Sequence, residues 1–251
     1  MIFFDIDGTL IDHATASAAA SLALYDHFLG AIPFDRREFP ETWEDIMDRH
    51  FERFCRGEIS VWEQRRSRIR DAFRDPKLTD AECDSRYRVF IQHYESQTQA
   101  FDDVVPCLER LAGNRLGIIS NGIRAQQIGK LQRAGILQYF AVTIFSEDVG
   151  LGKPDPKIFA EACRLAGQNP RECIHVGDDV KADIGGGLAA GLKPVWLDRN
   201  GLRADGITVP RIPSLHDLTT VLKDYLPREE AVECRIYPDG TEECTEWPAR
   251  S

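Results

Sequence analysis

The sequence has few features of a membrane, secreted or redox protein. No apolar run approaches the roughly 20 residues that a membrane-spanning helix needs. The opening segment, MIFFDIDGTL, lacks the basic-then-apolar layout of a secretory signal, so we expect a cytoplasmic protein. None of the seven cysteines stands in a C-x-x-C pair, which leaves a metal or redox motif without support. We expect most of them to be reduced residues of the core.

Basic residues are also in deficit. Lysine and arginine together number 31 against 41 aspartates and glutamates, which gives a formal net charge of −10. An acidic balance of this size disfavours nucleic acid and anionic membranes as partners. The hydrophobic fraction of 43% in 251 residues is enough for a sizeable core, so one large domain, or a core with an insert, is predicted.

Short apolar segments alternate with helical stretches over most of the chain. The predicted strands are 2–6, 116–120, 141–146, 173–177 and 194–198. Helices are predicted after residue 120, from Pro156, over 180–190 and from Ser214 to Leu226. Strands joined by helices in this way indicate an α/β fold with a parallel, doubly wound sheet. Residues 1–13 and 101–226 are therefore assigned to one core domain.

Residues 14–100 differ from the rest because they contain no convincing strand. Four stretches are compatible with helices, at 15–30, 41–56, 60–74 and 79–98. We expect a helical insert between the first two strands, at the carboxyl edge of the sheet, where α/β proteins bind ligands.

The tail, residues 227–251, is acidic. Pro238-Asp239-Gly240 is a turn signal, so a hairpin is possible, and disorder is the alternative. Cys234 and Cys244 are equidistant from Asp239 and would face each other across such a hairpin. Two unpaired thiols are the preferred interpretation in a reducing compartment.

The first candidate site follows the first predicted strand. Asp5 and Asp7 are two residues apart and project to the same side of an extended chain. Gly8 allows a sharp exit of the backbone, and Thr9 follows it. Buried like charges repel each other, so such a pair normally needs a cation or a shared proton. A turn with a capping aspartate is the structural alternative.

Three further motifs lie at or beyond the ends of later strands. They are Ser120-Asn121-Gly122, Gly152-Lys153-Pro154-Asp155-Pro156, and Gly177-Asp178-Asp179 with Asp183 beyond it. Each one alone is explained by helix capping or by a solvated charge. Together they bring acidic, hydroxyl and amine groups to the carboxyl ends of neighbouring strands, where these groups converge.

These motifs, DIDGT, SNG, GKPDP and GDD-x-x-x-D, occur in family order, and the chain resembles the haloacid dehalogenase (HAD) superfamily over about residues 1–226. The resemblance is to phosphatases of that superfamily with a helical cap after the first motif. The run SEDVGLGKPDPKIF followed by HVGDD is similar to the branch of 5′-nucleotidases and acylneuraminate-9-phosphatases. It implies a Rossmann-like core with 14–100 as the cap domain.

The resemblance also implies a mechanism. Asp5 would be the nucleophile that forms an aspartyl-phosphate, and Asp7 the acid for the leaving alcohol and the base for water. Lys153 would neutralise the phosphoryl group and Asp5. The Asp178 and Asp5 side chains and the Asp7 carbonyl oxygen would hold Mg²⁺, whose charge offsets the carboxylates and the phosphate.

Other positions carry implied or open roles. Thr9, Ser120 and the Asn121 backbone amide would hold phosphoryl oxygens. Asp179 is either an outer acid or a helix cap, and Asp183 either orients Lys153 or ligated water or is structural. The cap must supply specificity, and one hypothesis is that a cap arginine reaches the substrate. The candidates are Arg65, Arg66, Arg68 and Arg70, most of which we expect to be solvated.

The predicted substrate is a small phosphorylated metabolite. A nucleoside 5′-monophosphate is preferred, from branch resemblance alone, and a sugar phosphate or phosphoglycolate is the alternative. A 2-haloacid dehalogenase shares the fold and the nucleophile, but it has no leaving alcohol to protonate, and such enzymes lack an acid at the position of Asp7. A phosphomutase and a catalytically silent binding module complete the alternatives. The oligomeric state is not predicted.

Overall fold

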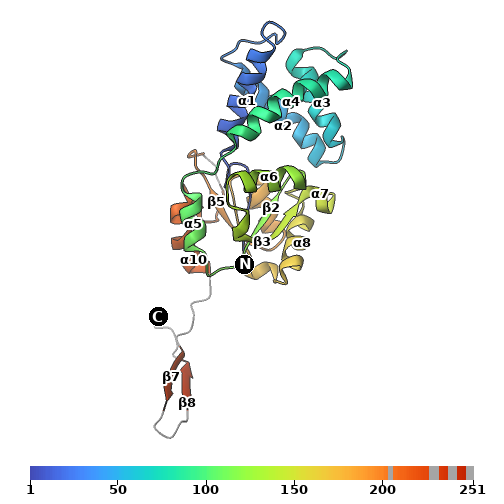
Figure 1. The fold of residues 1–251 in the computed structure, drawn as a ribbon. Helices are drawn as coiled ribbons and strands as arrows, with labels where there is room; N and C mark the ends of the chain where they lie inside the picture. Colours follow the sequence, from blue (N-terminus) through green and yellow to red (C-terminus); the bar gives the residue numbers. More distant parts are fainter. Residues whose placement is uncertain (203–205, 226–231, 237–241, 247–251) are drawn as a thin grey trace.

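The structure, a computed structural model, describes residues 1–202, 206–225, 232–236 and 242–246. Its main sheet has six parallel strands in the order β3-β2-β1-β4-β5-β6 (Figure 1). The strands are β1 (Ile2–Phe4), β2 (Leu116–Ser120), β3 (Phe140–Phe145), β4 (Ile174–Gly177), β5 (Lys193–Leu197) and β6 (Arg211–Ile212). The predicted α/β fold with a parallel sheet is confirmed.

Strand β1 occupies the centre of this sheet. Phe3 pairs in register with Gly117 of β2 on one side and with His175 of β4 on the other. From β1 the chain extends outward through β2 and β3, and it later returns to add β4, β5 and β6 on the opposite side. The strand order therefore reverses between β1 and β4, and at such a point a crevice opens at the carboxyl ends of the strands.

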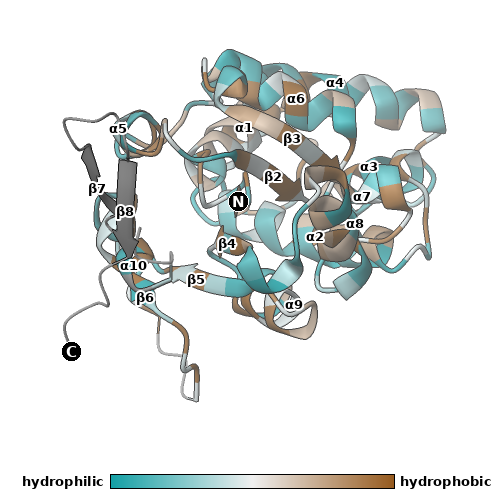
Figure 2. Ribbon diagram, turned by 90° about the horizontal axis from the view of Figure 1, so that it is seen from below, coloured by the Kyte–Doolittle hydropathy of each residue, from teal (hydrophilic) through white to brown (hydrophobic). Residues whose placement is uncertain are grey.

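Helices cover both faces of the sheet. They are α5 (Val104–Arg110), α6 (Arg124–Arg133), α7 (Ser146–Val149), α8 (Pro156–Ala166), α9 (Gly186–Ala189) and α10 (Leu218–Tyr225). Ile2 and Phe4 belong to one buried cluster with Leu131 of α6, whereas Phe3 packs in another with Phe159 of α8. This alternation follows from the two-residue period of a strand. Figure 2 shows β2 and β3 coloured as hydrophobic between helices of mixed colour.

Local signals explain most helix boundaries. Asp155 caps α8 by accepting a hydrogen bond from the Lys157 amide, and Pro156 begins the helix, as predicted. Ser214 caps a short 3₁₀ turn, Leu215–Asp217, and α10 follows directly; residue 226 lies outside the described residues. The helix predicted over 180–190 is instead a π-helical segment, Val180–Gly185, that runs into α9.

Of the five helices between β1 and β2 in the sequence, the first four belong to the insert, and Figure 1 shows them stacked above the sheet. They are α1 (His13–His27), α2 (Phe39–Cys55), α3 (Val61–Phe73) and α4 (Asp80–Gln97). Each predicted helical stretch of the insert overlaps one of them, and α1 and α2 both begin two residues earlier than predicted. Their shared core is aromatic, with Trp43 packed on Phe90 and Phe90 stacked on Tyr94. A separate core supports our proposal that residues 14–100 form a cap domain.

The tail contains a second, two-stranded sheet. Strands β7 (Val232–Ile236) and β8 (Glu242–Glu246) pair antiparallel, and their register sets Cys234 opposite Cys244. This antiparallel pairing is what the hairpin proposed for the tail requires, while the predicted turn at Pro238-Asp239-Gly240 lies outside the described residues. In the part of the chain that the structure describes, no helix is long and apolar enough to cross a membrane.

Candidate active site

The loop after β1 brings two carboxylates to the carboxyl end of the sheet. Asp5 is 7% exposed, and its amide donates to the Val176 carbonyl of β4 at 2.9 Å, which holds the loop against the neighbouring strand. Gly8 adopts a φ of +82°, and a Cβ there would collide with the Asp178 carboxylate. Only glycine meets both conditions, so the DIDGT turn allows Asp178 to approach the Asp5 loop.

Lys153 lies beside Asp5 as predicted. Its Nζ donates to Asp5 Oδ1 at 2.5 Å and to Asp183 Oδ1 at 2.6 Å. Asn121 fixes the lysine loop, because its side chain accepts from the Lys153 amide at 2.7 Å and donates to the Lys153 carbonyl at 3.0 Å. Asn121 thus fixes the backbone of Lys153, while Asp5 and Asp183 hold its ammonium group.

Asp183 is the buried anchor of this lysine. It is 1% exposed, accepts from the Asp179 amide at 3.1 Å and lies 2.8 Å from His175 Nε2. Gly177 gives it room, since a Cβ at Gly177 would collide with the Asp183 side chain. The sequence left the role of Asp183 open, and its contacts match the orientation of Lys153. Asp179 caps the following segment by accepting from the Lys181 and Ala182 amides, both at 2.7 Å.

Asp5, Asp178 and Asp183 form a dense acidic group. One carboxylate oxygen of each lies within 4.8 Å of the others. Burial raises the pKa of Asp5 to about 7, against the effect of Lys153. Burial, together with Asp5 and Asp183, raises the pKa of Asp178 to about 8. One lysine therefore does not balance the three carboxylates, and the group fits a divalent cation held by oxygen ligands. We call Asp5, Lys153, Asp178 and Asp183 the floor group.

Thr9 contacts the floor group directly. Its hydroxyl donates to Asp178 Oδ1 at 2.8 Å, and the residue is fully buried. Thr9 does not line the cavity described below. In this arrangement the hydroxyl orients Asp178, a contact that the sequence did not indicate.

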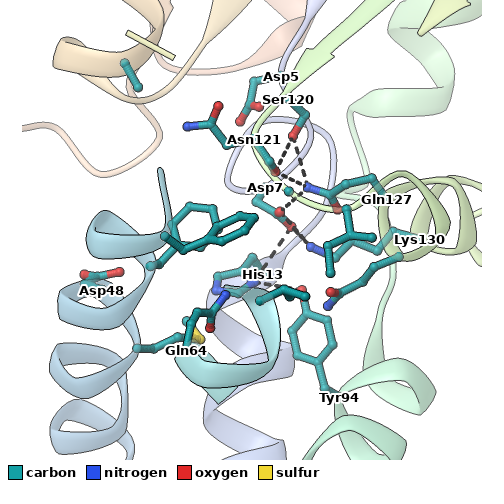
Figure 3. Close-up of a pocket in the computed structure, with 18 of the residues that line it drawn as sticks. Asp5, Asp7, His13, Asp48, Gln64, Tyr94, Ser120, Asn121, Gln127 and Lys130 are labelled. Carbon is teal, nitrogen blue, oxygen red and sulfur yellow. Dashed lines mark hydrogen bonds and ion pairs between the residues drawn. The ribbon is translucent and has the colours of Figure 1, made fainter. Parts of the chain in front are cut away.

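Asp7 lies apart from the floor group and has its own cation. Both of its oxygens are 2.6 Å from Lys130 Nζ, and Gln127 Nε2 donates to it at 3.1 Å (Figure 3). Burial alone would raise the pKa of Asp7, but Lys130 and His13 outweigh it and lower the pKa to about 2. Asp7 is therefore ionised near neutral pH in this arrangement.

Ser120 ends strand β2 at the same edge, and Asn121 follows it. Gln127 Nε2 donates to Ser120 Oγ at 3.1 Å and to the Asn121 carbonyl at 2.8 Å, so one amide joins both residues to Asp7. Lys130 and Gln127 were not predicted. The available signal was their position in the helix after β2, because Gln127 and Lys130 share its buried side with Leu131.

One cavity of about 300 Å³ joins the sheet edge to the cap. The floor group, Asp7, Ser120 and Asn121 all line its lower part. His13 of α1 and Tyr94 of α4 lie beside Asp7, and the His13 Nδ1 and the Tyr94 hydroxyl are 2.7 Å apart (Figure 3). The residues predicted to catalyse, to bind phosphate or to hold the metal are thus brought together, and of these Thr9 alone lies outside the lining.

The four cap arginines divide into two pairs. Arg66 bonds to Asp80 and Asp84, and Arg70 bonds to Asp80 and the Leu78 carbonyl, so both are held within the cap. The other two line the cavity. Arg65 donates to Gln126 of α6 at 3.2 Å and lies over the Tyr87 ring. Arg68 is buried.

A family model of the haloacid dehalogenase-like hydrolases matches residues 1–191. The chain belongs to this family. The predicted superfamily and the assignment as a hydrolase enzyme are thereby confirmed. Among its relatives, N-acylneuraminate-9-phosphatase from Homo sapiens is 28% identical over 249 residues, which covers 94% of this chain and 95% of the relative. Pyrimidine 5′-nucleotidase YjjG from Escherichia coli is 38% identical over 122 residues, or 47% of this chain and 54% of the relative.

Solved structures share the whole fold. The HAD-hydrolase YfnB from Bacillus subtilis, in a structure bound to magnesium, has a TM-score of 0.73 at 23% identity, covering 88% of this chain and 97% of that one. A 2-haloacid dehalogenase from Pseudomonas syringae has a TM-score of 0.68 at 32% identity, covering 90% and 98%. The relatives of this haloacid dehalogenase-like protein thus include both phosphatases and a dehalogenase.

Proposed function

We propose that the protein is a Mg²⁺-dependent phosphomonoester hydrolase that acts on small phosphorylated metabolites. The observation that supports this most strongly is the presence of Asp7 in the cavity of the floor group. Asp5 offers a nucleophile next to a lysine, and Asp7 is a second carboxylate with its own hydrogen-bonding partners. Ester cleavage needs both, because the leaving alcohol takes a proton.

Asp5 performs the first step. One of its oxygens attacks the phosphorus, the bond from phosphorus to the ester oxygen breaks, and the alcohol departs with a proton from Asp7. Lys153 stabilises the charge on Asp5 and on the transferring phosphoryl group. Since Asp7 is ionised in the arrangement described, it must gain a proton as the phosphoester enters.

Water completes the cycle. Asp7, again a carboxylate, takes a proton from water, and the resulting hydroxide attacks the phosphorus of the aspartyl-phosphate. The bond from phosphorus to Asp5 breaks, which releases inorganic phosphate and restores Asp5. Ser120 and the Asn121 amide are the proposed ligands of the phosphoryl oxygens. Thr9 contributes to that contact only if its hydrogen bond to Asp178 is exchanged.

Mg²⁺ is the proposed cofactor, with Asp5, Asp178 and the Asp7 carbonyl oxygen as ligands. Oxygen donors and the raised pKa values of Asp5 and Asp178 fit a hard divalent cation. When bound, Mg²⁺ supplies positive charge that offsets the phosphoryl oxygens. Asp183 adds a third carboxylate near the same point and keeps Lys153 in place.

Nucleoside 5′-monophosphates are the first substrates to examine, and sugar phosphates and phosphoglycolate the next. The nucleotidase and N-acylneuraminate-9-phosphatase names of the relatives support this range. Location in the cytoplasm is part of the same proposal.

Dehalogenation of a 2-haloacid is the second candidate, favoured by the 32% identity to the Pseudomonas enzyme. Displacement of halide needs no acid, so Asp7 and its contacts to Lys130 and Gln127 weigh against it. The test measures phosphate release from a panel of monoesters with Mg²⁺ and chloride release from 2-chloropropionate. We expect phosphate release that Asp5→Asn abolishes. Chloride release without any phosphatase activity would overturn the proposal.

A further inference from the structure

The upper wall of the cavity carries two buried polar side chains from one helix. Gln64 and Arg68 are four residues apart on α3, so they lie on the same face of that helix. Both line the cavity, and they are only 5% and 6% exposed. Figure 3 shows Gln64 on the cap side of the cavity, across from Asp7. We call these two residues the roof pair.

Each member of the roof pair has one buried polar atom without a hydrogen-bonding partner in the part of the chain that the structure describes. These atoms are the Nε of Arg68 and the Oε1 of Gln64. Buried polar atoms in folded proteins are nearly always partnered, so an orphan donor and an orphan acceptor in the same wall require an explanation. Arg66 on the same helix shows the usual arrangement, with three hydrogen bonds to Asp80 and Asp84.

Among the described residues, no carboxylate forms an ion pair with Arg68. Burial lowers its pKa, and Glu44 and Asp48 oppose that effect from a distance. Glu44 is engaged elsewhere, since it accepts from Ser17 at 3.0 Å and lies 3.5 Å from His13. A guanidinium held out of water without a carboxylate partner favours an anion from outside the chain.

We propose that the roof pair binds a carboxylate on the organic part of the substrate. The substrate would then be a phosphorylated acid rather than a phosphoester whose organic part is uncharged. This inference rests on the proposed phosphatase function. The phosphate has its own cation in Lys153, so Arg68 is available to a second acidic group. Arg68 donates to the carboxylate, and Gln64 accepts from a neighbouring hydroxyl or N–H. The preference thereby moves from nucleoside monophosphates to phosphorylated hydroxy acids and acidic sugars.

Matched pairs of phosphoesters test the roof pair. One pair is 3-phosphoglycerate and glycerol 3-phosphate, and a longer pair is 6-phosphogluconate and sorbitol 6-phosphate; within each pair only a carboxylate is exchanged for a hydroxymethyl group. We expect a higher kcat/KM for the acid of at least one pair. Arg68→Gln should lower that value by about 10- to 100-fold, mainly through KM, and change the neutral partner less than about threefold. Arg68→Lys should restore part of the loss.

Arg66→Gln is the matched control, because it removes an arginine from the same helix without altering the cavity wall. Thermal melting of each variant separates loss of binding from loss of folding. Equal effects of Arg68→Gln on both members of each pair, or no preference for either acid, would overturn the inference. A preference for glucosamine 6-phosphate over glucose 6-phosphate would also overturn it, because this part of the cavity would then bind a cationic substrate group at Asp48. Failure to hydrolyse even p-nitrophenyl phosphate would instead overturn the proposed function.

Discussion

The floor group and the roof pair are both buried and polar, yet they are organised in opposite ways. On the floor, Lys153 joins Asp5 to Asp183, and Asp183 is held by further contacts to His175 and the Asp179 amide. In the roof, Gln64 and Arg68 each have an orphan atom. The polar groups of the floor are already held in place by partners within the chain. The orphan atoms of the roof pair would gain partners only from a bound molecule. On these two proposals, chemistry and selectivity would reside in separate layers of the fold.

Removal of Mg²⁺ should have the largest effect on the floor. Chelation is expected to abolish phosphate release, because the carboxylates and the phosphate dianion would repel one another. Mg²⁺ at about 100 times its dissociation constant should add about 2.7 kcal/mol to the free energy of unfolding. Thermal melting with and without Mg²⁺ measures this, and Asp178→Asn should remove most of the shift. Unchanged activity in chelator would contradict the role of the floor group.

Asp183→Asn should have the next largest effect. The substitution removes the charge that aims Lys153 at Asp5, and we expect kcat to fall by about 10- to 100-fold. Steady-state kinetics measure the loss, with Asp84→Asn, at a cap residue that does not line the cavity, as the charge-matched control. An Asp183→Asn enzyme with the kcat of the unsubstituted protein would make Asp183 purely structural.

Lys130→Met tests the separate pairing of Asp7. Without Lys130 the pKa of Asp7 rises, which favours its protonated form, but the carboxyl group loses its two short contacts. We expect the loss of orientation to outweigh the easier protonation, so kcat on an alkyl phosphate should fall by about tenfold. The loss on p-nitrophenyl phosphate should be smaller, since nitrophenolate departs without a proton. Equal losses on the two esters would show that Lys130 acts through something other than leaving-group protonation.

Thr79→Ala should affect stability alone. Thr79 caps α4 in a capping box with Glu82, on a part of the cap that does not line the cavity. Loss of the cap should cost about 1 kcal/mol in the free energy of unfolding. Denaturant titration checks this value, and kcat/KM should stay unchanged. A large kinetic change would mean that cap stability and catalysis are coupled.

The sequence predicted the floor better than the roof for a geometric reason. Asp5, Lys153 and Asp178 lie at or shortly beyond the carboxyl ends of parallel strands, and a sheet brings those ends to one edge. Once the strands were recognised, the convergence followed. The four motifs also occur in family order along the chain, and this order indicated the family.

The residues of the roof pair could not be predicted from the local sequence pattern. Which arginines of α3 face the cavity depends on how the helix is rotated about its axis, and that is set by the packing of Ile69 and Phe73 against the other cap helices. Lys130 similarly reaches Asp7 only through the packing of α6 on the sheet. The π-helical segment from Val180 to Gly185 also lacked a sequence signal, although it places Asp183 under Lys153.

Covalent capture of the phosphoryl group tests the central claim most directly. The Asp7→Asn variant, mixed with p-nitrophenyl phosphate and Mg²⁺ and quenched in acid, should carry one phosphoryl group on the peptide that contains Asp5, as read by mass spectrometry. Nitrophenolate leaves without an acid, and hydrolysis of the intermediate then stalls without its base. Phosphate release with no phosphorylated Asp5 at any quench time, or a phosphoryl group on another residue, would contradict the account.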